Sequence, residues 1–96
     1  MRDSPQQEQR ATLEILNKLG LHARAAKLIV ETVTTYDADI KIAKDGQTVS
    51  GTSIMGIMML AAEQGSQIDV TTSGPQAGEA LEAIRNLLDS RFNEDE

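Results

Sequence analysis

The chain has 96 residues and contains no cysteine, no tryptophan, one tyrosine, one phenylalanine and one histidine. The absence of cysteine excludes a disulfide framework, a zinc site made of thiolates and catalysis by a thiol. Two aromatic rings are too few for the stacking platform on which proteins bind single-stranded nucleic acid. A lone histidine has no second histidine or cysteine with which to share a soft metal, so we expect no metal site. We find no nucleotide-binding loop either, and expect no bound cofactor.

Long hydrophobic runs and an excess of positive charge are absent as well. No apolar segment approaches the roughly 20 residues that a membrane-spanning helix needs. The polar stretch 1–10 lacks the apolar core of a signal peptide. The formal net charge of −6 repels the phosphates of nucleic acids and the surface of anionic membranes. We therefore expect a cytoplasmic protein that binds neither nucleic acid nor membrane.

The length of the chain is sufficient for one small domain. A domain of this size buries a modest core and leaves little room for an enclosed active site, so its function is expected at the surface. Residues 1–10 are polar and without periodicity, and we expect them to form a disordered tail. The folded domain is expected over 11–92, followed by an acidic, frayed tail over 93–96.

Hydrophobic periodicity predicts four strands and three helices. Alternation of apolar and polar residues predicts strands over about 11–15, 38–43, 48–50 and 67–72. Helical spacing predicts amphipathic helices over about 23–35 and 77–88, and a short helix is expected over about 54–63. The Asp45-Gly46 pair suits a tight hairpin between the second and third strands. The order β-α-β-β-α-β-α indicates an α+β domain with its helices packed on one face of a mostly antiparallel sheet.

The single histidine, His22, lies where a loop ends and the first helix is predicted to begin. The first turn of a helix has unpaired N–H groups and a partial positive charge, so it binds anions and favours a neutral imidazole. Arg24 adds a planar cation that fits phosphate oxygens, and Gly20 lets the loop turn closely. These parts suit a phosphoryl acceptor, because phosphoryl transfer depends mainly on positioning and charge stabilisation. The alternative is that His22 is only a helix cap or a surface residue.

The predicted second helix raises two further questions. Ser53 stands directly before it and is either a plain N-cap or a site of regulatory phosphorylation. The helix is apolar nearly all round, whereas a short helix on an open sheet buries only one face. The stripe Ile57, Leu60 and Ala61 is expected in the core, which leaves Ile54, Met55 and Met58 facing outward. Exposed methionines suit adaptable contacts with several partners, and the alternative is that the whole helix is buried.

Two segments resemble one known family. Gly20-Leu21-His22-Ala23-Arg24 resembles the active-site motif of the histidine-containing phosphocarrier (HPr) family of the bacterial phosphotransferase system. Ser53-Ile54-Met55-Gly56-Ile57-Met58-Met59-Leu60 resembles that family's second signature, a regulatory serine and its helix. The separation of the two motifs and the order of elements also fit, over roughly residues 11–90.

The resemblance implies an HPr-like open-faced β-sandwich, with three helices on one face of a four-stranded antiparallel sheet. It implies that His22 accepts a phosphoryl group on Nδ1 from the phosphoenolpyruvate-dependent Enzyme I and passes it to an EIIA-type protein. Arg24 and the backbone N–H groups of Ala23 and Arg24 would stabilise the phosphate. The protein would be a monomeric covalent carrier in a phosphotransferase relay and not a free-standing enzyme.

The resemblance also implies one docking surface for donor and acceptor, because both must reach the same imidazole. The residues expected on it are Ala23, Ile54, Met55, Met58 and Met59. Ser53 would be the regulatory position, phosphorylated by an HPr serine kinase in a host that has one. The alternative of a different class is an interaction module that is switched by Ser53 and in which His22 is incidental.

Within the family, three features resemble the nitrogen-related branch (NPr) more than the sugar-transport branch. They are Asn17-Lys18-Leu19-Gly20, Gly74-Pro75-Gln76 and the acidic ending. Two positions depart from the family pattern. Ala25 replaces the usual proline, so we expect the first helix to persist with a less fixed start. Thr52 stands where the family often has lysine, which weakens the case for regulation at Ser53.

Overall fold

A computed structural model describes residues 8–94 of the chain. In this part the strands are β1 (Glu8–Glu14), β2 (Asp39–Lys44), β3 (Gln47–Ser50) and β4 (Gln67–Ser73). The helices are α1 (Ala23–Val33), α2 (Ile54–Met59), α3 (Ala77–Asp89) and the 3₁₀ helix η1 (Arg91–Asn93). The predicted element order is therefore confirmed, with η1 as an addition. None of these helices is both long and apolar enough to cross a membrane.

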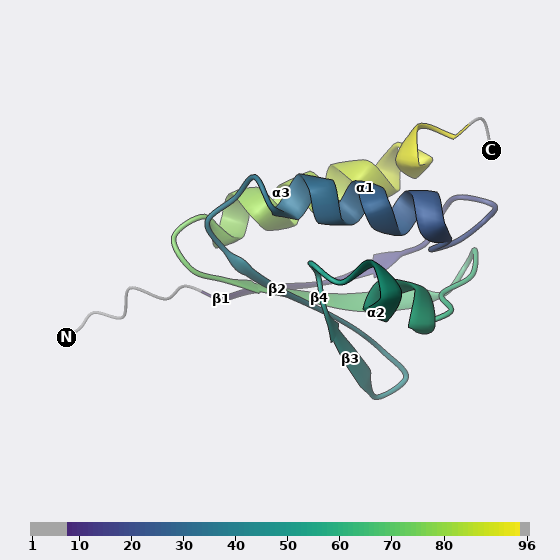
Figure 1. Cartoon of the computed structure of the whole chain (residues 1–96), viewed down its shortest axis with the longest axis horizontal. Coiled ribbons are helices and arrows are strands. Elements are labelled where there is room, and N and C mark those ends of the chain that lie inside the picture. The colour runs from purple at the N-terminus through teal and green to yellow at the C-terminus, as the bar shows by residue number, and fades with distance from the viewer. Residues whose placement is uncertain (1–7, 95–96) are drawn as a thin grey trace.

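The four strands form one antiparallel sheet in the order β1-β4-β2-β3. Helices α1 and α3 run side by side along one face of this sheet, and α2 packs against α1 and β3 (Figure 1). The strands bury alternate residues toward the helices, as in β4, where Ile68, Val70 and Thr72 are buried and Asp69 is exposed. The opposite face of the sheet is polar, so the domain is an open-faced α+β sandwich, as predicted.

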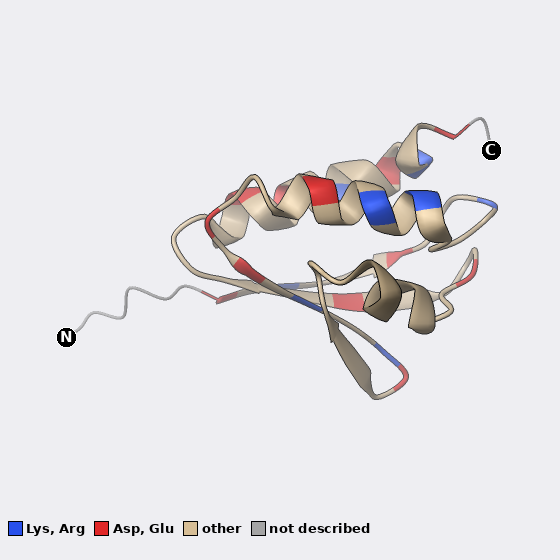
Figure 2. Ribbon diagram, viewed as in Figure 1, with Lys and Arg blue, Asp and Glu red and all other residues tan. Residues whose placement is uncertain are grey.

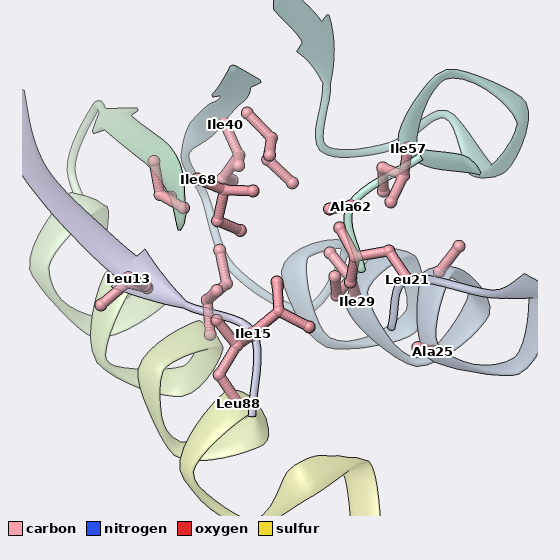
Figure 3. Close-up of a cluster of buried hydrophobic side chains, with 14 of the residues drawn as sticks. Leu13, Ile15, Leu21, Ala25, Ile29, Ile40, Ile57, Ala62, Ile68 and Leu88 are labelled. Carbon is pink, nitrogen blue, oxygen red and sulfur yellow. The ribbon is translucent and has the colours of Figure 1, made fainter. Parts of the chain in front are cut away.

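The core lies between the sheet and the helices, and Figure 3 shows side chains of α1, α2, α3 and the strands meeting there. Among its largest fully buried members are Ile15, Ile29, Ile40, Ile42, Ile57, Ile68, Ile84 and Leu88. Burial of one such side chain stabilises the fold by about 1.5–3 kcal/mol, against about 0–1 kcal/mol for an exposed ion pair such as Lys27–Glu31. The positions of the helices are therefore set by the core and not by the surface charges, which Figure 2 shows scattered over α1 and α3.

Two predicted boundaries are wrong. Strand β1 begins at Glu8, so residues 8–10 belong to the sheet and not to a tail, because β4 offers them backbone partners as far as the Glu8–Ser73 pair. Residues 1–7, the rest of the predicted tail, lie outside the described residues. Helix α2 ends at Met59 and not at residue 63, because Ala61 takes a left-handed conformation with φ of 52°. Ala61, which was predicted to lie in the core, is exposed, and Ala62 is buried there instead.

The predicted frayed tail over 93–96 is also wrong where the structure describes it. Arg91, Phe92 and Asn93 have φ of 54°, 55° and 60°, which turns the chain sharply at the end of α3. Left-handed backbone costs about 1–2 kcal/mol per non-glycine residue, so the turn needs compensation. Phe92, whose side chain is fully buried in the core, supplies much of it. The turn carries Glu94 back over the start of α1, and residues 95–96 lie outside the description.

We expect Phe92→Ala to lower the free energy of unfolding by about 3–5 kcal/mol, because it empties a filled core position. Denaturant unfolding followed by circular dichroism measures this change. Leu19→Ala is the control: Leu19 is 65 % exposed, and a surface truncation changes stability by about 0.5 kcal/mol or less. Equal stability of the two variants would show that Phe92 does not anchor the turn.

Candidate functional site

His22 is the N-cap of α1. Its backbone is extended, with φ of −78° and ψ of −177°, and its carbonyl accepts the first helical hydrogen bond from Ala26 N–H at 2.9 Å. The Nδ1 atom of its ring accepts a hydrogen bond from Arg24 N–H at 3.2 Å. The capping role that the sequence left open is thus present. It places Nδ1 against the N–H groups of a helix N-terminus, where an anion is stabilised.

The loop before His22 is fixed to the segment that follows α2. Gly20 has φ of 69°, and a Cβ there would lie 2.4 Å from the carbonyl oxygen of Ala62. Leu21 N–H donates to that same oxygen at 2.9 Å. Asn17, which is fully buried, donates from Nδ2 to the carbonyl of Gly20 at 2.9 Å. Glycine is required at position 20 both for its left-handed backbone and for this close approach.

Glu94 is a member of the site that sequence reasoning missed. Its Oε2 lies 2.6 Å from His22 Nε2, and Asn17 Nδ2 donates to Oε1 and Oε2 at 3.2 and 3.4 Å. Its side chain is only 11 % exposed, and the side chain of His22 is 27 % exposed. The acidic ending suggested a solvated tail, and no local signal shows that the chain folds back by a turn of left-handed residues. Glu94 and His22 are 72 positions apart.

Arg24 points toward this same segment. Its Nη1 donates to the carbonyl of Phe92 at 2.8 Å and lies 3.8 Å from Glu94 Oε2. Arg24, which was predicted to stabilise a phosphate, thus contacts His22 through its backbone N–H. Its half-exposed guanidinium binds the turn after α3 instead. The site therefore combines one imidazole, one guanidinium and one carboxylate at the start of α1.

The environment of Glu94 changes its acidity. Burial of the carboxyl raises its pKa, but the hydrogen bonds from His22 and Asn17 and the positive charge of Arg24 lower it more. The pKa of Glu94 therefore lies below the ordinary value of a glutamate. Glu94 is consequently ionised at neutral pH, and its carboxylate is a hydrogen-bond acceptor for the ring.

Ser53 is the N-cap of α2. Its Oγ accepts a hydrogen bond from Gly56 N–H at 2.9 Å, so the capping interpretation of this serine is confirmed. A Cβ at position 56 would lie 3.0 Å from this Oγ and 3.1 Å from Val49 Cβ, which explains why glycine is favoured in the first turn.

Helix α2 exposes a hydrophobic surface, as the sequence predicted. Ile54, Met55, Met58 and Met59 are exposed by 38, 69, 38 and 64 %, whereas Ile57 is fully buried. Figure 2 shows no charged residue on α2. Helix α2 contacts α1, and Figure 3 places Ile57 in the cluster that contains Leu21 and Ala25.

Leu19, 65 % exposed in the loop before His22, is a further exposed hydrophobic residue that sequence reasoning did not select. Ala23, which follows His22, is exposed as well. Over residues 8–94 no three histidine, cysteine, aspartate or glutamate residues gather in a way that could hold a metal ion.

Comparison with known proteins matches this arrangement to one family. A family model described as "PTS HPr component phosphorylation site" matches residues 9–90. The phosphocarrier protein HPr of Neisseria meningitidis is 41 % identical over 85 residues, which are 88 % of this chain and 96 % of that protein. The phosphocarrier protein NPr of Klebsiella oxytoca is 41 % identical over 88 % of this chain and 94 % of its own length. A crystal structure of HPr from Thermoanaerobacter tengcongensis superposes with a TM-score of 0.87 at 40 % identity, covering 92 % of this chain and 99 % of that one.

These matches span nearly the whole chain, and they agree with the histidine at the helix N-terminus and with the open-faced sandwich. The protein is thus a small phosphocarrier of the phosphotransferase system. The chain belongs to the HPr family.

The lowered pKa of Glu94 predicts how stability depends on pH. The pKa of this carboxyl is lower in the folded than in the unfolded state. Its ionised form therefore stabilises the fold at pH values above its pKa in the unfolded state, and this stabilisation is lost as the pH falls through its pKa in the folded state. At neutral pH we expect Glu94→Gln to lower the free energy of unfolding by about 1 kcal/mol, because the amide oxygen still accepts a hydrogen bond but the charge that strengthens it is lost. The difference in free energy of unfolding between the wild type and Glu94→Gln should disappear in acid, where Glu94 is protonated. Urea unfolding of both proteins across this pH range measures it, and a constant difference would contradict the prediction.

Proposed function

We propose that His22 is the residue that carries the phosphoryl group, on Nδ1. The observation that supports this most directly is the hydrogen bond from Arg24 N–H to Nδ1. An imidazole nitrogen that accepts a hydrogen bond carries a lone pair and not a proton, so Nδ1 is the nucleophilic atom of the ring. Because the ring is partly exposed at the start of α1, a partner protein has access to it.

The helix N-terminus supplies stabilisation for the transferred group. A phosphoryl group on Nδ1 replaces the hydrogen bond to Arg24 N–H and stands before the N–H groups of Ala23 and Arg24, where the helix dipole favours negative charge. The guanidinium of Arg24 is 52 % exposed and is held by the carbonyl of Phe92 and by Glu94. A dianionic phosphoryl group competes with these two acceptors for the arginine.

The partners that this mechanism requires are a donor of the Enzyme I type, which takes its phosphoryl group from phosphoenolpyruvate, and an acceptor of the EIIA type. We place this relay in the cytoplasm. Asn17-Lys18-Leu19-Gly20 and Gly74-Pro75-Gln76 favour the nitrogen-related branch. An HPr and an NPr are equally identical to this chain, so overall identity does not separate the branches. A gene for a nitrogen-type EIIA beside the gene of this protein would support this assignment, and a neighbouring sugar-permease gene would argue against it.

The phosphocarrier role is tested by incubation with Enzyme I and radiolabelled phosphoenolpyruvate. We expect the wild type and Ser53→Ala to acquire phosphate that is labile in acid and stable in base, and His22→Ala to acquire none. Circular dichroism verifies that His22→Ala is folded. Labelling of His22→Ala as strong as that of the wild type would show that another residue carries the phosphoryl group.

We propose that the partners dock on the exposed hydrophobic surface formed by Ala23, Ile54, Met55, Met58 and Met59. This surface lies on α2 and at the start of α1, next to His22, and methionine side chains adapt to partners of different shape. Ser53 lies at the edge of this surface, at the start of α2. A phosphate on Ser53 would be tolerated by the helix N-terminus and would place two negative charges beside the hydrophobic contact.

The docking proposal is tested by Met55→Asp. We expect this change to raise the KM for phosphorylation by Enzyme I by about ten-fold, because it places a charge in a desolvated contact. The kcat should change little, since the histidine is not altered. Thr48→Asp is the control, because Thr48 is exposed and lies in register with Ala43 and Asp69 on the helix-free face of the sheet. An equal effect of the two substitutions would indicate that net charge, and not docking on α2, is responsible.

A further inference from the structure

The two ring nitrogens of His22 have different partners. Nδ1 accepts the N–H of Arg24 at 3.2 Å, whereas Nε2 lies 2.6 Å from a carboxylate oxygen of Glu94. A carboxylate only accepts hydrogen bonds, so Nε2 must donate and therefore carries the proton. Both contacts require the same tautomer, with a proton on Nε2 and a lone pair on Nδ1. Together they also restrict rotation of the ring.

Glu94 is held in place by groups other than the histidine. The buried amide of Asn17 donates to both carboxylate oxygens, and the guanidinium of Arg24 lies 3.8 Å away. The buried ring of Phe92 and the hydrogen bond from Arg24 to its carbonyl fix the turn that carries Glu94. The carboxylate is thus preorganised at Nε2, which is the usual arrangement by which a supporting group orients a reactive histidine.

We propose that Glu94 is the positioning residue of the phosphoryl-accepting histidine and compensates the charge that the ring gains. This inference rests on the proposed role of His22. In the transfer, the lone pair of Nδ1 forms the Nδ1–P bond while the bond from phosphorus to the donor's leaving group breaks with its electron pair. The ring then carries a positive charge and keeps its proton on Nε2, beside the carboxylate of Glu94. The onward transfer reverses the charge change.

The phosphorylated ring would have two negatively charged groups beside it, the carboxylate of Glu94 and the phosphoryl group, and these lie at opposite edges of the ring. Glu94 faces the Nε2 edge, and the phosphoryl group on Nδ1 faces the N–H groups at the start of α1. The carboxylate therefore stabilises the cationic ring without occupying the position of the phosphate. Asn17 acts one step further out, since its amide sets the position of both Glu94 and the carbonyl of Gly20.

The experiment compares Glu94→Ala and Glu94→Gln with the wild type and with the control Glu82→Gln, an exposed glutamate of α3. Phosphoramidate is the phosphoryl donor, because it is a small molecule that does not use the docking surface. Phosphohistidine is followed by ³¹P NMR, and the Nε2–H of His22 is followed by ¹⁵N-edited proton NMR. Circular dichroism confirms that each variant is folded.

We expect the wild type and Glu82→Gln to show a low-field, slowly exchanging Nε2–H. Glu94→Ala should lose this signal and react about ten-fold more slowly, the typical effect of removing a supporting group. Glu94→Gln should keep a weaker Nε2–H signal, because its amide oxygen still accepts, but it should react more slowly because the charge is absent. This split between signal and rate is not expected from a purely structural role.

The inference is overturned if both Glu94 variants react within about two-fold of the wild type, or if the Nε2–H signal is the same in Glu94→Ala as in the wild type. A different result would show that the proposed function of His22 itself is wrong. In that case the wild type itself acquires no phosphate on His22, whether from phosphoramidate or from Enzyme I.

Discussion

The close contact of Gly20 and Leu21 with the carbonyl of Ala62 determines where the histidine stands. This contact joins the loop before α1 to the segment after α2, so that two motifs about 30 residues apart in the chain share one end of the helical layer. It requires a left-handed glycine on one side and a helix that stops at Met59 on the other. Both the first turn of α1 and the exposed face of α2 are positioned by it.

The parts of the site that are local in sequence could be predicted from it. Alternating and helical periodicities identified the strands and helices, and the position of His22 at a helix start followed from the change between them. The exposure of Met55 and Met59 followed from an apolar helix that can bury only one side. These predictions succeeded because hydrophobic pattern and helix capping depend on neighbouring residues.

The parts that depend on distant residues could not be predicted. Residues 8–10 have no strand-like pattern, yet they pair with β4 because its backbone is available there. Ala61 has high helix propensity, but tertiary contacts place it in a left-handed turn that brings Ala62 to Leu21. Glu94 was assigned to a solvated tail, because the three left-handed residues before it carry no glycine signal. In each case a contact across the fold outweighs the local preference.

The turn that carries Glu94 over the histidine has a consequence for the motions of the domain. It contributes no strand to the sheet and is held to the body by one buried ring and a few hydrogen bonds. Segments with so few buried contacts open at a lower free energy than the domain unfolds. We therefore expect this turn to open locally, at a free-energy cost set largely by exposure of the ring of Phe92, while the sheet and its helices remain folded.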